Sequence, residues 1–160
     1  MRHNTERLGN RPIELVYFAI GIILLLILAI VAKGQTGPSQ VKQPLFREYR
    51  GVRLAMTAEE ARAKLGVPAM KSDEQDFYVF SANETAQIVY AAQKVVTIST
   101  DYTGGIGAPD YKSVVGEGLL QRPDGSLFRM VLHDSERFWV SYNKSASEVP
   151  VVTITIGAMK

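Results

Sequence analysis

Hydrophobic residues gather first near the N-terminus, where the segment Leu15–Ala32 (LVYFAIGIILLLILAIVA) contains no charged side chain. A helix of this length, with its flanks, spans the roughly 30 Å hydrocarbon core of a bilayer. The pattern therefore predicts a single transmembrane helix at 13–33. It also predicts a cytoplasmic tail at 1–12 and, from the Gly, Pro, Ser and Gln that follow the apolar segment, a linker at 34–49.

A cleaved signal peptide is the alternative reading of the same segment. The apolar region of a signal peptide is about 7–15 residues long and ends at a small-x-small site. Here the segment is longer, and Ile30–Ala32 is a poor cleavage site. Arg2, Arg7 and Arg11 precede the segment, and the basic residues that follow it, Lys33, Lys42, Arg47 and Arg50, nearly balance them. A short basic tail before a long C-terminal domain favours a cytoplasmic N-terminus. The following domain is then expected on the periplasmic side of a bacterial inner membrane.

Beyond the linker, a segment with a helical pattern is followed by segments with a strand-like pattern. Thr57 and Glu60 have the spacing of a capping box, so Ala58–Leu65 is expected to form a helix that ends at Gly66. Three runs with strand-like alternation follow: Asp76–Phe80, Ala86–Ala91 and Val95–Tyr102.

The second half repeats this order. A brief helix is expected at 109–116, with Pro109 at its first position. Three further strand-like runs follow: Leu127–Leu132, Arg137–Tyr142 and Val151–Ile156. Chance similarity of β-branched runs is the alternative to a true repeat.

Together these patterns predict an α+β domain over residues 50–160. It would consist of tandem α-β-β-β repeats, at about 50–103 and about 108–157, that form one antiparallel sheet with the helices on one face.

Alternation divides the expected strands between two faces. The larger apolar side chains are expected to face the helices: Tyr78, Phe80, Ile88, Tyr90, Val96, Ile98, Phe128, Met130, Leu132, Phe138, Val140, Tyr142, Val152, Ile154 and Ile156. The other face is then open. Its candidates for protein binding are Trp139, Arg137, Arg129, Phe77 and Val79. If the assignment is off by one residue, Trp139 is instead a core residue.

Composition excludes several kinds of chemistry. The chain of 160 residues has no cysteine and only two histidines, which excludes disulfides, thiolate metal sites and multi-histidine metal sites. Residues 1–49 have a net charge of +3 and residues 50–160 a net charge of −1. A nearly neutral domain lacks the basic surface that nucleic-acid binding needs, so no nucleic-acid partner is expected.

Three short motifs could suggest chemistry, and each has a simpler reading. The sequence 133–135 (His-Asp-Ser) holds the residue types of a catalytic triad, but adjacent residues do not converge, so a turn is expected. The glycines of 104–107 lack the Lys-Ser/Thr of a phosphate-binding loop and are expected to link the repeats. The acidic residues Asp73, Glu74 and Asp76 lack the spacing of a calcium loop and are expected in a solvated turn. We therefore expect no catalytic residue, no cofactor and no metal site.

Part of this region resembles a known family. The pattern Gly51-Val52, Leu54, Met56-Thr57, Glu60-Ala61 and Leu65-Gly66-x-Pro68 resembles the opening motif of the BamE (SmpA/OmlA) family, and the order of elements is similar to the β-lactamase-inhibitor-protein-like fold. The resemblance implies a small envelope domain that binds other proteins. The chain differs from that family in having Ala55 where a glycine is usual, and in having an apolar segment in place of a lipid-bearing cysteine.

The function expected from these patterns is that of a non-catalytic, membrane-anchored accessory subunit of a larger inner-membrane complex, such as a respiratory or photosynthetic one. Its partners would be the bilayer and other membrane-protein subunits, contacted through the transmembrane helix and the open sheet face. The alternative is a BamE-like scaffold for envelope assembly or quality control.

Overall fold

A computed structural model describes residues 45–160 except residue 117. Within this part of the chain, eight strands join into one antiparallel sheet, and two further strands form a separate hairpin. The hairpin consists of β1 (Glu48–Tyr49) and β2 (Val52–Arg53). The strands of the sheet are β3 (Met70–Lys71), β4 (Gln75–Val79), β5 (Glu84–Ala91), β6 (Lys94–Thr103), β7 (Leu120–Gln121), β8 (Leu127–His133), β9 (Phe138–Lys144) and β10 (Val151–Ala158). The helices are α2 (Ala58–Leu65) and α3 (Tyr111–Val115).

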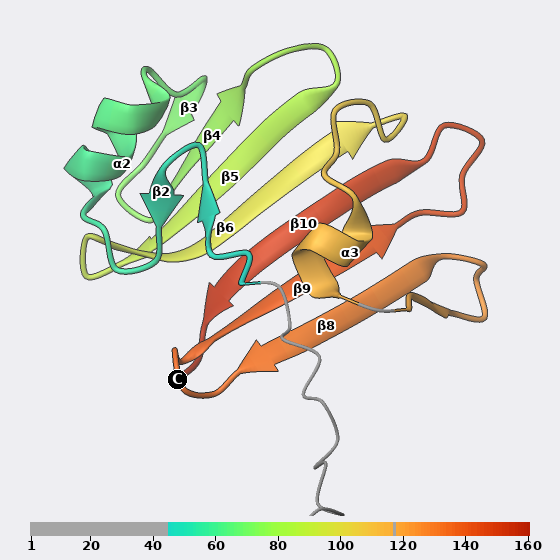
Figure 1. Ribbon diagram of the computed structural model, residues 1–160. Helices are drawn as coiled ribbons and strands as arrows, with labels where there is room; N and C mark the ends of the chain where they lie inside the picture. The colour runs from blue at the N-terminus through green and yellow to red at the C-terminus, as the bar shows by residue number, and fades with distance from the viewer. Residues whose placement is uncertain (1–44, 117) are drawn as a thin grey trace, which may run out of the picture. The chain divides into compact units, whose positions relative to one another are not determined.

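The strand order β3-β4-β5-β6-β10-β9-β8-β7 is a mirrored pattern in which β6 and β10 meet at the centre (Figure 1). In each half a short helix is followed by four strands, and the last of the four is the central one. The side chains of Ser99 and Thr155, which are directly opposite each other in the central pair, lie 3.1 Å apart between their hydroxyl oxygens. The origin of the two halves by duplication stays a prediction.

The expected fold class is wrong. Of the described residues, 47% lie in strands and 11% in helices, so the domain is mostly antiparallel sheet and not an α+β arrangement of α-β-β-β units. Each half contributes a fourth strand, β3 or β7, which is only two residues long. A pair of residues is too short to produce visible alternation, because the side-chain period of a strand is itself two residues.

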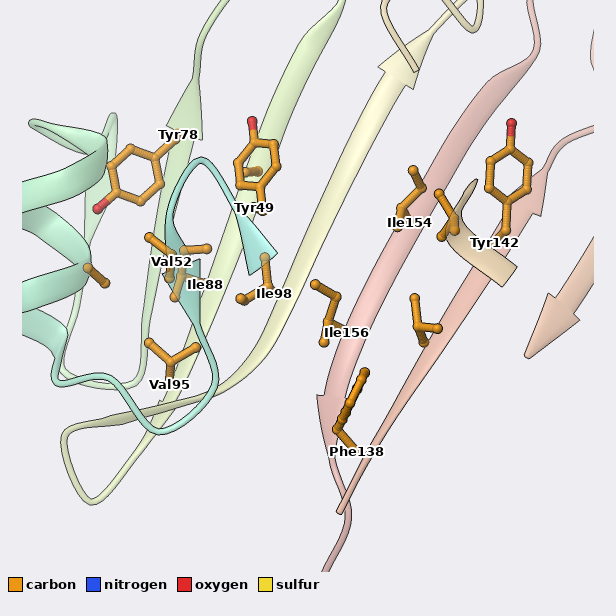
Figure 2. Close-up of a cluster of buried hydrophobic side chains, with 14 of the residues drawn as sticks. Tyr49, Val52, Tyr78, Ile88, Val95, Ile98, Phe138, Tyr142, Ile154 and Ile156 are labelled. Atoms are coloured by element: carbon orange, nitrogen blue, oxygen red, sulfur yellow. The ribbon is translucent and has the colours of Figure 1, made fainter. Parts of the chain in front are cut away.

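One face of the sheet is covered, and the core lies beneath the cover (Figures 1 and 2). The covering elements are α2, the β1–β2 hairpin and α3. Val52 of the hairpin and Ala61 of α2 are completely buried, as is Val114 of α3. Most of the predicted core is confirmed as buried: Tyr78, Ile88, Tyr90, Ile98, Phe138, Val140, Tyr142, Val152, Ile154 and Ile156.

Helix α2 forms as its capping residues predict. The backbone N–H of Thr57 donates to Glu60 Oε2 at 2.8 Å, and the backbone N–H of Glu60 donates to Thr57 Oγ1 at 3.2 Å, which completes the capping box. Gly66 ends the helix with a φ of 84°, a conformation that glycine adopts without strain.

Helix α3 is shorter than expected and begins later. Asp110 is its N-cap, and the Asp110 side chain accepts a hydrogen bond of 2.8 Å from the backbone N–H of Lys112. Pro109 therefore precedes the N-cap instead of opening the helix. Because aspartate satisfies an unpaired N–H at this position, it determines where the helix begins.

The predicted tail at 1–12, the predicted membrane span at 13–33 and most of the predicted linker at 34–49 lie outside the described residues. At the end of that linker, Glu48–Tyr49 form β1 and Tyr49 is buried, so the folded part starts before residue 50. Neither helix in the described part of the chain has the length and hydrophobicity that a membrane crossing requires.

Candidate interaction surface

The face of the sheet opposite the helices is left open, and we call it the open face. The strand registers place two charged strand residues of the described chain on it, Lys94 at a hairpin end and Asp101. Asp101 accepts a hydrogen bond of 2.6 Å from the hydroxyl of Thr153 on the neighbouring strand. Hydroxyl side chains occupy the middle of the face: Thr97, Ser99, Thr153 and Thr155. Charge depletion of this kind is a property of the central part of protein–protein interfaces.

Trp139 lies on this open face, as predicted. Its strand neighbours Phe138 and Val140 are buried in the core, so alternation turns the indole to the other side. Gly157 is directly opposite Trp139 on β10, and a Cβ atom added at Gly157 would lie 2.4 Å from the indole ring. The indole therefore occupies the space where a Cβ atom of residue 157 would lie, and its position requires that residue 157 has no side chain.

Strand β8 has the opposite orientation to the one expected. Val131 and His133 are buried in it, whereas Met130 and Leu132 are 46% and 56% exposed. Arg129 therefore faces the covered side, where its Nη1 donates to the carbonyl of Gly118 at 3.0 Å. Alternation predicted the wrong orientation for β8 because its exposed face, with Phe128, Met130 and Leu132, is more apolar than its buried face, which contains Arg129 and His133. The prediction that Val96 is a core residue is also wrong, because a register irregularity between β5 and β6 buries Val95 instead.

The corrected orientation creates an apolar patch at one side of the open face. Its members are neighbours across β7, β8 and β9, and we call them the β8 patch: Leu120, Phe128, Met130, Leu132 and Trp139. Leu120 is 69% exposed. The guanidinium carbon of Arg122 lies 3.8 Å from the centre of the Phe128 ring, which places one positive charge at the margin of the patch.

The five predicted site residues do not form one site. Phe77 and Val79 are on the open face, but their strand β4 is separated from β9 by four strand spacings, or about 19 Å. Arg137 lies in the turn before β9, with a φ of 59°, and its guanidinium donates to the carbonyl of Lys160 at 2.8 Å. Trp139 keeps its predicted place, and its neighbours are the residues of the β8 patch.

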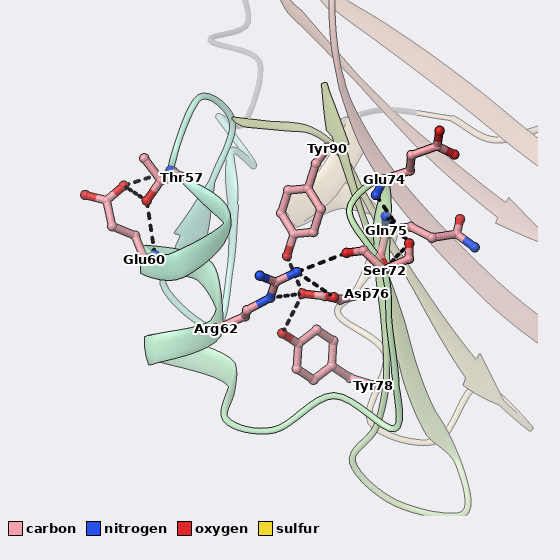
Figure 3. Close-up of polar contacts among 9 residues, drawn as sticks. All are labelled: Thr57, Glu60, Arg62, Ser72, Glu74, Gln75, Asp76, Tyr78 and Tyr90. Atoms are coloured by element: carbon pink, nitrogen blue, oxygen red, sulfur yellow. Dashed lines mark hydrogen bonds and ion pairs between the residues drawn. The ribbon is translucent and has the colours of Figure 1, made fainter. Parts of the chain in front are cut away.

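A buried polar cluster on the covered side was not predicted (Figure 3). Asp76, expected in a solvated turn, is completely buried and accepts hydrogen bonds from Arg62 Nε at 2.8 Å and Arg62 Nη2 at 3.0 Å. The hydroxyl of Tyr90 donates to the same carboxylate at 2.7 Å, and that of Tyr78 at 3.4 Å. The carbonyl of Ser72 accepts a further bond of 3.1 Å from Arg62. Arg62 belongs to α2 and Asp76 to β4, so the cluster joins the helix to the sheet.

The pKa values in this cluster follow from burial and from the ion pair. Burial alone would raise the pKa of Asp76, but the hydrogen bonds from Arg62 and Tyr90 and the charge of Arg62 outweigh it and lower the pKa. Burial, followed by the nearby Asp76 charge, raises the pKa of Tyr78 to about 12. The carboxylate is thus ionised and the phenol neutral at pH 7. Because the oxygens of the Asp76 carboxylate already accept hydrogen bonds from protein groups, the cluster is best explained as structural.

A second polar contact fastens the hairpin to the sheet. Glu84 of β5 accepts a hydrogen bond of 2.8 Å from the hydroxyl of Tyr49 and forms an ion pair of 2.7 Å with Arg50. The guanidinium of Arg50 also lies 4.3 Å from the centre of the Phe80 ring. The hairpin is therefore held over β5 by both charge and aromatic contact.

The motifs that could suggest catalysis do not form a site. His133 ends β8 and stacks on Phe138 with ring centres 4.5 Å apart, and the Ser135 hydroxyl bonds to Glu136. Gly104 and Gly105 adopt positive φ in the turn after β6. In the described residues, no group of three or more His, Asp and Glu side chains is placed to hold a metal ion.

No family model, curated protein or solved structure matches the chain. The resemblance to the BamE family therefore stays a prediction, and the open face with its β8 patch is the best candidate for a functional surface.

Proposed function

We propose that this chain is a non-catalytic accessory subunit of a membrane-protein complex, held at the membrane by its apolar segment 15–32, and that its β domain docks a protein partner through the open face. The observation that carries the proposal is the chemistry of that face. An exposed sheet face that is nearly free of charge and has a cluster of large apolar side chains has the composition of an interface.

The apolar segment supports the membrane part of the proposal. Its hydrophobic length matches a bilayer core. Residues 33–44, which separate it from the described domain, extend over at most about 43 Å. A domain tethered at that distance stays within reach of other subunits in the same membrane. We place the domain in the periplasm of a bacterial cell, because the basic N-terminal residues favour a cytoplasmic tail.

Trp139 is the residue we expect to contribute most to docking. Tryptophan is over-represented among the few residues that dominate binding energy. Its indole already packs against Gly157 and is partly buried, so little conformational entropy is lost when a partner covers it. Leu132, directly opposite on β8, extends the same surface.

Retention in the native complex tests this proposal. The full-length chain is purified from membranes in mild detergent, and the proteins that remain bound are identified by mass spectrometry. We expect Trp139→Ala to weaken association by about 2 kcal/mol, which is roughly a thirtyfold loss of affinity. Val67→Ala is the control, because Val67 is an apolar residue that is 95% exposed and lies beside α2, away from the open face. Equal retention of both variants would contradict docking through Trp139.

The identity of the retained proteins distinguishes the two expected settings. Stoichiometric subunits of an energy-transducing complex would support an accessory subunit. Outer-membrane assembly proteins would favour the BamE-like scaffold instead.

A further inference from the structure

Among the described residues, strand β8 has a free edge along most of its length. On its outer side, β7 pairs with Leu127 and Phe128 and then leaves the sheet. The departure is marked by the carbonyl of Gly118, which accepts a hydrogen bond from the Arg129 side chain at 3.0 Å. The stretch from Arg129 to His133 therefore lacks an outer neighbour among the described strands.

The free backbone groups of this stretch belong to Met130 and Leu132. The backbone N–H of Arg122 donates to the carbonyl of Ser126 at 2.8 Å, so the backbone groups of Ser126 point outward. Successive residues of a strand point their backbone groups to opposite sides, so those of Phe128, Met130 and Leu132 also point outward. Phe128 is paired with β7, and the next two residues are left with free N–H and C=O groups.

This edge has little of the usual protection against pairing. Natural edge strands carry lysine, proline, inward-pointing charges or bulges that prevent the addition of a strand. Arg129, at one end of the free stretch, is such an inward-pointing charge. Here the two residues with outward backbone groups are exposed and apolar, at 46% for Met130 and 56% for Leu132. At the opposite edge of the sheet, the unpaired stretch is shorter. There β3 pairs with Asp76 and Phe77 of β4, and β4 ends two residues later, at Val79.

The free stretch is complementary to itself. It is centred on Val131, and an antiparallel two-fold pairing about that residue places Met130 opposite Leu132 of a second copy. This register pairs all of the free backbone groups. If the second copy were shifted by two residues in one direction, its strand would collide with β7. If it were shifted by two residues in the other direction, it would collide with the turn at Asp134.

We infer that β8 pairs with β8 of a second copy of this chain, in the register Met130 to Leu132, and joins the two sheets into one. The β8 patches of the two copies then form one continuous apolar strip on the open face. The inference concerns the edge of the sheet and does not depend on the proposed docking of another protein on its face.

Disulfide trapping in the full-length chain tests the register directly, because the chain contains no native cysteine. Met130→Cys and Leu132→Cys chains with tags of different length are co-expressed, and the membranes are oxidised mildly. Opposite residues of a hydrogen-bonded pair have Cα atoms about 5.5 Å apart, within disulfide range. Identical positions would be about 9 Å apart, too far for a disulfide. We expect the mixed disulfide to exceed either same-position disulfide by at least about tenfold.

Val79→Cys is the matched control, since Val79 is a 58% exposed apolar residue at the end of β4, near the other edge of the sheet. We expect it to give no disulfide dimer above background. The inference is overturned if same-position and mixed disulfides form equally, or if Val79→Cys crosslinks as fast. It is also overturned if the thiols form no disulfide and react with a soluble maleimide. It is equally overturned if the thiols are protected from the maleimide but no dimer forms, because a lipid or another protein at this edge would give that result.

Discussion

At the residue scale, the position of Trp139 depends on a glycine. The indole occupies the space above Gly157 that any Cβ atom would fill. Gly157 has no positive φ, so its role is to leave room and not to make a turn. Alternation in the sequence correctly placed Trp139 on the open face, but no pattern could identify its support, because the glycine lies on another strand.

A double-mutant cycle tests this pair. We expect Gly157→Ala to lower the free energy of unfolding by about 1–3 kcal/mol, because the added methyl group collides with the indole. In a Trp139→Ala background the same substitution should be neutral or slightly stabilising, since alanine loses less backbone entropy than glycine. Urea unfolding of the four variants measures the coupling. Additive effects would show that the two residues do not depend on each other.

At the element scale, the covering elements are fastened to the sheet by charge as well as by apolar packing. Arg62 joins α2 to Asp76 of β4, and Glu84 of β5 holds the hairpin through Tyr49. The sequence predicted α2 well, because its capping residues and terminal glycine are local signals. It did not predict the fastening, since Arg62 and Asp76 meet only after the helix packs on the sheet.

The Asp76–Arg62 pair predicts a specific pH dependence. The pKa of Asp76 is lowered from its usual 3.8, so its contribution to stability is complete above about pH 4 and is lost as the pH falls through the lowered value. We expect Asp76→Asn to cost about 3 kcal/mol at pH 7 and to flatten the decline of stability below pH 4. Denaturant unfolding between pH 2 and pH 7 provides the measurement. Glu59→Gln, at an exposed position of α2, should leave the acid profile unchanged, and a wild-type profile in Asp76→Asn would contradict the role of the pair.

Strand orientation was predictable only where the more apolar parity of a strand is also its buried side. In β9, Phe138, Val140 and Tyr142 share one parity and are buried, as assigned. In β8 the parity of Phe128, Met130 and Leu132 is the more apolar one, but the other parity, which contains Arg129 and His133, faces the covered side. The error moved Met130 and Leu132 into the predicted core and so concealed the β8 patch.

At the scale of the whole molecule, the chain combines a β domain that has its own core with an apolar N-terminal segment. The buried cluster is drawn from both halves of the sheet and from the covering elements, and Phe46, just before the hairpin, packs against it. We expect a fragment that starts at Gln43 to be soluble without detergent and to unfold in one cooperative transition. The full-length chain should stay in the membrane fraction during carbonate extraction, and its release would contradict the membrane attachment.

We propose that the open face docks a protein partner, and photo-crosslinking in intact cells would detect that contact. A photoreactive amino acid is placed at Thr97 in the middle of the open face, three strands away from the free edge of β8, and at Val67 beside α2 as the control. Irradiation should join the chain through Thr97 to a distinct protein other than itself, while Val67 gives no such product. A Thr97 position that crosslinks to nothing, or to the same diffuse background as Val67, would contradict the account.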